Sequence, residues 1–273
     1  MRVHKLLAEI VEHKRQEVER AKAELPLPVI QERLPRLPTP RNFRASVRGR
    51  PDVRIIAEMK RASPSHGVFT DLYDPRILAQ EFAGNGAAAI SVLTDMKYFG
   101  GQCFDLRRAR RYMPLPLLRK DFIIDPYQIY EARYWLADAV LLIVAIVDEA
   151  LLRDLLAVTR ELGMAALVEC HEADEIEMAL RVGSDIIGIN NRDLATLEVD
   201  ISRTESLARL VPLECTLVAE SGIRTRQDVE RLADAGIDAA LIGTALMRDP
   251  EPGLALRQFV RVPCRREARG GRG

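Results

Sequence analysis

A charged pair follows an apolar run early in the chain, and its residue types suit acid–base chemistry. The run Ile55-Ile56-Ala57 passes into Glu58-Met59-Lys60-Arg61 and then into the turn-rich stretch from Ala62 to Gly67. Side chains alternate between the two faces of a strand, so Glu58 and Lys60 are expected on one face. A carboxylate beside an ammonium can transfer protons, or it can be a weak ion pair at an exposed strand end. This stretch alone does not separate the two interpretations.

Polar and charged residues also follow other apolar runs along the chain. In α/β barrels the active site lies at the carboxyl ends of the strands, so such residues become candidates for one shared site. Each residue taken singly is most simply a charged loop residue in water, but repetition at corresponding positions favours a site. The residues that follow the later runs are Lys120 and Asp121, Glu169, Asn190 to Arg192, Glu220 and Ser221, and Gly243 and Thr244.

Two of these pairs contain glycine and fit a phosphate site. Ser221-Gly222 and Gly243-Thr244 follow the seventh and eighth predicted strands, where many barrels bind phosphate through backbone N–H groups and a helix N-terminus. Either pair alone is weak support, because a glycine after a strand usually marks only a turn. Together they favour phosphate binding, and Ser63 and Ser65 of the first loop are further candidates.

The elements that must position these residues alternate regularly. Short apolar runs alternate with longer helical patterns, which predicts βα units and a parallel sheet. Asp74-Pro75 and Asp125-Pro126 each place a capping Asp before a Pro at the start of a predicted helix. The eight strands are expected at Ile55–Met59, Ala88–Leu93, Leu115–Arg119, Ala139–Ile143, Ala165–Val168, Ile186–Ile189, Thr216–Ala219 and Ala239–Ile242.

The expected fold is α/β, a (β/α)8 TIM barrel with an N-terminal helical extension. A helix-to-strand turn recurs along the chain, and each interval between successive turns holds two βα units. The turns are Gly86-Ala87-Ala88, Ala137-Asp138-Ala139, Gly183-Ser184-Asp185 and Gly236-Ile237-Asp238. No G-x-G-x-x-G follows the first strand, which argues against an open doubly wound sheet. We expect the barrel to span residues 54–260.

The two ends of the chain differ from the barrel in composition. Residues 1–53 begin with an amphipathic helical pattern and continue through a Pro-rich passage, so they are expected to pack on the barrel as a lid or a brace. The tail from Arg261 to Gly273 is rich in Arg and Gly and is expected to be disordered. The apolar residues of the first helical pattern are Leu6, Leu7, Ile10, Val11 and Val18.

Composition limits the classes of partner and site. Lys+Arg 40 and Asp+Glu 40 balance to a formal net charge of zero, so no overall field attracts nucleic acid or a membrane, and no run approaches the ~20 apolar residues of a membrane span. The cysteines form no C-x-x-C pair and the histidines have no ligand spacing, which predicts no metal site and favours a cytoplasmic location. Surface or cap roles are expected for all four histidines, and Cys170 and Cys215 are expected to be small buried hydrophobes. The residues concerned are His4, His13, His66, His171, Cys103, Cys170, Cys215 and Cys264.

Four segments closely resemble the motifs of indole-3-glycerol phosphate synthase. They are Glu58 to Ser65, Leu118 to Asp125, Gly188 to Leu194 and Ala219 to Ile223. The resemblance extends from the N-terminal helix to about Gly253. Small departures are His66, where many members carry Lys, Met96, where an acidic residue is usual, and Thr244, where Ser is common.

The resemblance implies an enzyme without a metal or cofactor. The implied reaction converts 1-(2-carboxyphenylamino)-1-deoxyribulose 5-phosphate to indole-3-glycerol phosphate in tryptophan biosynthesis, with loss of CO2 and water. It implies that Lys120 is the general acid for ring closure and that Glu169 handles the proton in dehydration. Lys60, with Glu58 as its partner, would share the acid role, and the step at which each lysine acts stays open.

The resemblance also implies the remaining parts of the site. Asn190 and Arg192 would orient the substrate's hydroxyl and carboxylate, and Asn190 and Ser221 are counted with the catalytic residues. Phe99 and Phe122 would line the anthranilate pocket. The expected substrate-binding residues are Ser63, Phe99, Phe122, Arg192, Glu220, Gly222, Gly243 and Thr244, with Ser221 also at the phosphate.

Two other functions stay open for a barrel of this kind. A sugar-phosphate isomerase, such as phosphoribosylanthranilate isomerase, would share the phosphate loops but does not need Glu58 and Lys60 together with Lys120. A non-catalytic binding or assembly barrel would be expected to lose a charged group, and none is missing. The expected partner is a phosphorylated small molecule, with no nucleic acid and no membrane, and the expected assembly is a monomer or a weak homodimer.

Overall fold

The computed structural model describes residues 5–49, 51–64, 66–70, 73–193 and 196–270, and its centre is a closed barrel of eight parallel strands. The strands follow one another around the barrel in sequence order, and the first pairs with the last through Arg54 to Ala57 and Ala239 to Ile242. All eight predicted strands are confirmed, and each end lies within two residues of its expected position. The barrel strands are β1 (Arg54–Met59), β4 (Ala89–Leu93), β5 (Leu117–Lys120), β6 (Ala139–Ile143), β7 (Ala165–Cys170), β8 (Ile186–Asn190), β9 (Thr216–Glu220) and β10 (Ala239–Ile242).

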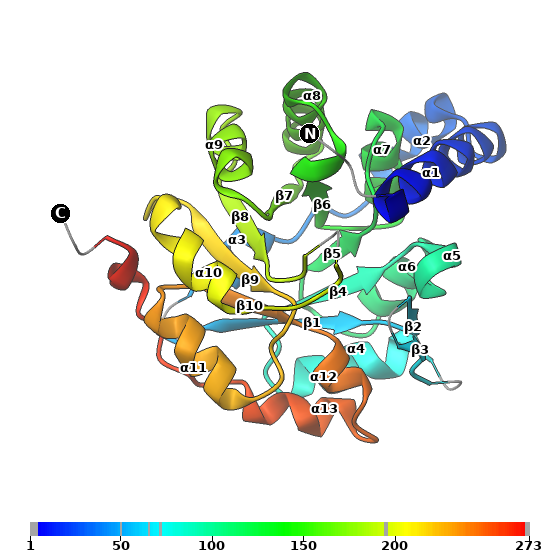
Figure 1. Cartoon of the computed structure of the whole chain (residues 1–273). Helices are drawn as coiled ribbons and strands as arrows, with labels where there is room; N and C mark the ends of the chain where they lie inside the picture. The colour runs from blue at the N-terminus through cyan, green and yellow to red at the C-terminus, as the bar shows by residue number, and fades with distance from the viewer. Residues whose placement is uncertain (1–4, 50, 65, 71–72, 194–195, 271–273) are drawn as a thin grey trace.

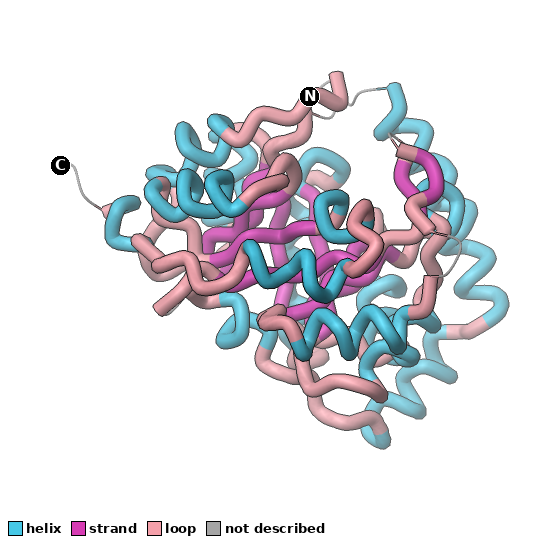
Figure 2. Tube along the Cα trace, turned by 90° about the horizontal axis from the view of Figure 1, so that it is seen from below, coloured by secondary structure: helices cyan, strands magenta, loops and turns pink. Residues whose placement is uncertain are grey.

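Helices surround the barrel on the outside, as the two perpendicular views show (Figures 1 and 2). The fold is therefore the predicted (β/α)8 barrel, and a short hairpin of β2 (Ala62–Ser63) and β3 (Gly67–Val68) extends the loop after β1. The helices are α1 (Lys5–Glu24), α2 (Leu27–Arg33), α3 (Phe43–Val47), α4 (Pro75–Gly84), α5 (Met96–Phe99), α6 (Phe104–Arg110), α7 (Pro126–Tyr134), α8 (Glu149–Glu161), α9 (Ala173–Arg181), α10 (Ser202–Leu207), α11 (Arg226–Asp234), α12 (Thr244–Met247) and α13 (Pro252–Ala255).

The predicted helix starts are confirmed at α4 and α7. The Asp74 side chain accepts a hydrogen bond from the backbone N–H of Arg76, and Pro75 is the first helical residue. Asp125 forms a capping box with Gln128 at the start of α7. These caps satisfy backbone donors that a helix leaves unpaired, which explains why Asp-Pro marks both starts.

Two buried carboxylates hold strands together at the amino ends of the barrel. Asp138 accepts a hydrogen bond from the backbone N–H of Leu117 at 2.8 Å, and Asp238 accepts one from Leu217 at 2.9 Å. Both aspartates are fully buried and both lie in the helix-to-strand turn that recurs in the sequence. The repeated turn thus gives neighbouring strands their register.

The N-terminal extension packs beside α7 (Figure 1). The Tyr127 hydroxyl lies 2.9 Å from the carbonyl oxygen of Ala21 and 2.8 Å from that of Leu25, so it bonds the end of α1 to α7. Lys22 of α1 forms an ion pair with Asp125 at 2.8 Å. None of the helices in the described ranges is both long and apolar enough to span a membrane.

The Arg/Gly-rich tail differs from the expectation of disorder over residues 261–270. Arg266 and Arg269 are buried and lie within 3.2 and 2.8 Å of the Asp238 carboxylate. The Asp238 side chain is buried at the amino ends of the barrel strands. A buried carboxylate needs cationic partners, and the tail supplies them. Composition alone predicts a solvated segment because it does not show this buried acceptor. Residues 271–273 lie outside the described residues.

Candidate active site

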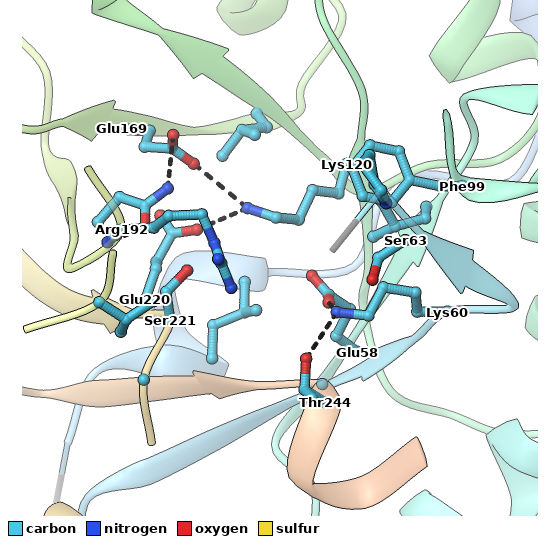
Figure 3. Close-up of a pocket in the computed structure, with 18 of the residues that line it drawn as sticks. Glu58, Lys60, Ser63, Phe99, Lys120, Glu169, Arg192, Glu220, Ser221 and Thr244 are labelled. Carbon is cyan, nitrogen blue, oxygen red and sulfur yellow. Dashed lines mark hydrogen bonds and ion pairs between the residues drawn. The ribbon is translucent and has the colours of Figure 1, made fainter. Parts of the chain in front are cut away.

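A cavity of about 400 Å³ opens at the carboxyl ends of the barrel strands. All of the predicted catalytic and substrate-binding residues line it, so residues far apart in the sequence meet at one mouth. Figure 3 shows two charged groups facing each other across this cavity, one around Lys120 and one around Lys60. The predicted residues are Glu58, Lys60, Ser63, Phe99, Lys120, Phe122, Glu169, Asn190, Arg192, Glu220, Ser221, Gly222, Gly243 and Thr244.

Lys120, the last residue of β5, reaches between two carboxylates. Its ammonium Nζ lies 2.6 Å from Glu220 Oε2 and 3.3 Å from Glu169 Oε2. Burial lowers the pKa of Lys120, but the carboxylates of Glu220, Glu169 and Glu58 outweigh burial and raise the pKa above its ordinary value of 10.5. Lys120 is therefore a charged acid in the resting site.

Glu169 on β7 is held by a second polar neighbour. The Asn190 amide Nδ2 donates to Glu169 Oε1 at 3.0 Å, and the Asn190 Oδ1 accepts from the backbone N–H of Arg192 at the same distance. Burial raises the pKa of Glu169, but the positive charges of Lys120 and His171 lower it by more. The pKa of Glu169 therefore lies below its ordinary value. Glu169 is thus kept as a carboxylate.

The pKa of Glu220 on β9 is raised instead of lowered. Burial raises the pKa of Glu220, and the nearby Glu169 carboxylate raises it as well, while Lys120 only partly opposes them. Two carboxylates share one ammonium, so the one with more cationic partners ionises first. In the resting site Glu169 is therefore the carboxylate that ionises at the lower pH.

Glu58 and Lys60 form the second charged group, as predicted from their shared face. Lys60 Nζ lies 3.0 Å from Glu58 Oε1 and 3.1 Å from the Thr244 hydroxyl, and both charged side chains are buried (Figure 3). Gly243 packs directly on Glu58, and a Cβ atom at position 243 would overlap the carboxylate. The weak surface ion pair is therefore excluded, and the glycine is required by this close approach.

Two phenylalanines form an apolar wall beside Lys120. The rings of Phe99 and Phe122 lie 6.3 Å apart between centroids, at an interplanar angle of 32°. Phe99 ends α5, and the Asp95 side chain caps this short helix at the backbone N–H of Tyr98. Phe122 follows Lys120 by two residues, so both rings are positioned by loops at the barrel mouth.

The turn after β9 has a left-handed backbone conformation at two successive residues. Ser221 and Gly222 have φ angles of 64° and 82°, in the left-handed region that few non-glycine residues adopt. The Asn191 amide Nδ2 donates to the Ser221 carbonyl oxygen at 3.1 Å. Strain at a serine in this region costs about 1–3 kcal/mol and is typically kept at functional sites.

Some residues of the cavity are absent from the sequence prediction. Leu6, Leu7 and Ile10 line the cavity, so the apolar face of the N-terminal helical pattern, expected as part of a lid or a brace, contributes to the site. Arg224 and Arg248 lie on the side of the glycine turns. Their positions after Gly222 and Gly243 are the only signal in the sequence, and Arg is common in exposed loops.

The expectation for the histidines is wrong for His171, which is buried between acidic side chains. Its place one residue after β7 is the signal that could have shown this. Cys170 and Cys215 are buried, as expected. Ser65 and His4 lie outside the described residues.

Comparisons with known proteins agree with the motifs. Residues 7–259 match the family model described as indole-3-glycerol phosphate synthase. Curated relatives named indole-3-glycerol phosphate synthase include one from Albidiferax ferrireducens, 48% identical over 258 residues, with 93% of this chain and 97% of the relative covered. Another, from Roseiflexus castenholzii, is also 48% identical and covers 90% of this chain and 94% of its own.

Solved structures of low identity share the fold. A 3-hexulose-6-phosphate synthase from Salmonella typhimurium superposes with a TM-score of 0.61 at 12% identity, covering 76% of this chain and 96% of its own. A thiamine phosphate pyrophosphorylase from Pyrococcus furiosus gives 0.58 at 15% identity, covering 80% and 96%. These likenesses support the barrel alone.

Proposed function

We propose roles for the site residues from the premise that this chain belongs to the indole-3-glycerol phosphate synthase family. The enzyme closes a ring in 1-(2-carboxyphenylamino)-1-deoxyribulose 5-phosphate and releases CO2 and water to form indole-3-glycerol phosphate, a step of tryptophan biosynthesis. Ring closure needs a proton donor at the C2′ carbonyl oxygen. Dehydration needs a group that handles a proton while a hydroxyl departs.

The substrate is proposed to span the cavity between its apolar and its glycine-rich sides. Phe99 and Phe122 offer an apolar wall for the anthranilate ring. The turns at Ser221-Gly222 and Gly243-Thr244 offer backbone N–H groups for the phosphate. This orientation places the C2′ carbonyl in the middle, between the two lysines.

Lys120 is proposed as the general acid of ring closure. The observation that carries this role is its ammonium, held between Glu169 and Glu220 at the wall of the cavity that Phe122 also lines. As the ring carbon attacks, the carbonyl oxygen gains negative charge and takes a proton from the ammonium. A cation in a poorly hydrated site stabilises this developing charge more than it would in water.

Glu169 is proposed to handle the proton of the dehydration step. Its carboxylate is fixed by Asn190 and lies next to Lys120, so the base and the acid act on neighbouring atoms. Once Lys120 has given its proton to the carbonyl oxygen and Glu169 has taken a proton from the substrate in dehydration, Glu169 can pass that proton to Lys120 across the ion pair. Asn190 serves by fixing the carboxylate in this position.

Lys60 and its neighbours are proposed to bind anionic parts of the substrate and to share the acid role. Its ammonium bridges Glu58 and the Thr244 hydroxyl, beside the glycine turn. Ser63 from the β1 loop and Ser221 from the β9 loop add hydroxyls near the phosphate. Asn190 and Arg192 would orient the substrate's hydroxyl and carboxylate, and Glu220 is a further substrate-binding residue.

An assay of indole fluorescence with the purified protein tests this function. Formation of the fluorescent product from the carboxyphenylamino substrate is the expected result. Isomerisation of a phosphoribosyl substrate without indole formation would support the isomerase instead, and no turnover would support a binding barrel. We expect the enzyme to act in the cytoplasm. We also expect a monomer or a weak homodimer, and sedimentation can measure this oligomeric state.

A further inference from the structure

His171 lies directly after β7, behind the proposed base. Its ring nitrogen Nε2 is 3.5 Å from Glu169 Oε1, and its other ring nitrogen, Nδ1, is 3.4 Å from Glu175 Oε2 on α9. The residue is only 5% exposed. Its backbone N–H donates to the same Glu175 oxygen at 2.6 Å, which fixes this glutamate beside the ring.

The two acidic neighbours determine which form of the imidazole fits. A neutral imidazole has one N–H donor and one lone pair, whereas an imidazolium has two N–H donors. Each nitrogen has a carboxylate oxygen within 3.5 Å and no hydrogen-bond partner among the described residues, so a neutral ring would place a lone pair close to a negative charge. The charged groups around the ring are Glu169 from β7, Glu175 from α9 and Glu220 from β9, with the Lys120 ammonium beyond Glu169.

We propose that His171 is a positioning residue that acts as an imidazolium and holds Oε1 of Glu169 together with Asn190, so that Oε2 stays directed at Lys120. This proposal rests on the proposed role of Glu169. The atoms agree with it, because Asn190 and His171 both lie at Oε1, and Lys120 lies at Oε2. One oxygen is thus fixed by the protein and the other is left for proton transfer.

The charge of His171 also affects the ionisation of Glu169. Burial lowers the pKa of His171, but Glu175, Glu169 and Glu220 raise it above its ordinary value of 6.5. In return His171, with Lys120, lowers the pKa of Glu169. The base is therefore ionised at a lower pH than it would be beside a neutral residue.

The charge state can be measured without any activity. In ¹⁵N NMR spectra of the wild-type protein, with His171 assigned by its loss in His171→Gln, both ring nitrogens should be protonated at pH 7. A neutral His171 at pH 7 would overturn the proposal. Failure of the indole assay would leave this measurement valid, so the two failures are distinguishable.

The effect on Glu169 is measured by the pH dependence of kcat/KM. The acid limb should move to higher pH by about 1 unit in His171→Gln, because an opposite charge this close lowers a carboxyl pKa by ~1–3 units. Glu175→Gln should move the acid limb in the same direction but by less. This variant replaces His171→Gln as the test if His171→Gln does not fold.

His13→Gln is the matched control. His13 on α1 forms a similar i,i+4 pair with Glu17 at 3.3 Å and does not line the cavity. The acid limb of the kcat/KM profile should therefore not move in His13→Gln. A uniform loss of activity in His171→Gln and Glu175→Gln, with the acid limb in place, would show a merely structural role and overturn the proposal.

Discussion

The ammonium of Lys14 lies 2.8 Å from the carboxylate of Asp121 and fastens α1 to the loop that follows β5. The same ammonium lies 2.7 Å from Asp95, which caps α5, and Lys14 is almost completely buried. Asp121 separates Lys120 from Phe122, and α5 ends with Phe99. One lysine of the extension therefore contacts both loops that carry the aromatic wall.

Lys14→Met should raise KM on the order of tenfold or more. The change takes the ammonium away from Asp95 and leaves Asp121 in an ion pair with Arg119 alone. Breaking a buried ion pair costs about 3–5 kcal/mol, which should release α1 from the mouth before the barrel unfolds. Steady-state kinetics and thermal unfolding measure the two effects. Lys22→Met is the matched control, because Lys22 lies on the same helix but forms a more exposed pair with Asp125.

If Lys14→Met lowered thermal stability while KM stayed unchanged, the extension would be a brace and not a lid. The same distinction applies to deletion of residues 1–40, which is expected to raise KM more than it lowers thermal stability.

Asp121 should make the protein sensitive to acid. Burial raises the pKa of Asp121, but Lys14 and Arg119 bring it well below its ordinary value of 3.8. Its contribution to the free energy of unfolding is therefore full above about pH 4 and is lost as pH falls through the lowered pKa. Wild type should lose stability below pH 4 more steeply than Asp121→Asn in urea unfolding. Equal slopes would show that Asp121 is not ionised in this network.

The glycine turns should tolerate loss of a hydroxyl better than addition of a methyl group. Ser221→Ala and Thr244→Val remove single hydroxyls from a cradle proposed to consist mainly of backbone N–H groups, so each should weaken binding by about 1 kcal/mol. Gly243→Ala places a Cβ against the Glu58 carboxylate and should cost more in both KM and kcat. A loss of kcat at unchanged affinity in Ser221→Ala would move Ser221 from binding to chemistry.

Turnover is expected to survive exhaustive chelation. In the parts of the chain that the structure describes, no group of three or more His, Cys, Asp or Glu side chains could hold a metal ion. Activity should be measured before and after dialysis against a chelator. Strict dependence on added metal would contradict the proposed acid–base mechanism.

The strands and their polar ends could be predicted because their signals are local. Apolar runs, Asp-Pro caps and glycine after a strand each act within a few residues, and barrel geometry then brings Glu58, Lys120 and Glu169 to one mouth. The pairing of Lys60 with Glu58 was predictable for the same reason, since side chains two apart on a strand share a face.

Contacts between distant segments could not be predicted in this way. The burial of Lys14, His171, Arg266 and Arg269 depends on carboxylates that the fold brings to them. Charged residues are usually exposed, so local sequence favours solvent for each of them. Only the three-dimensional neighbours show that these charges are enclosed and paired.

Lys120→Met tests the central claim most directly, with Glu169→Gln beside it. The account assigns Lys120 to proton donation, and loss of general acid–base catalysis typically costs ~10²–10⁴-fold. The rate of indole formation in a single turnover, followed by fluorescence, should fall by this factor while substrate affinity changes much less. A Lys120→Met variant with a near wild-type rate of indole formation would contradict the assignment of Lys120 as the general acid.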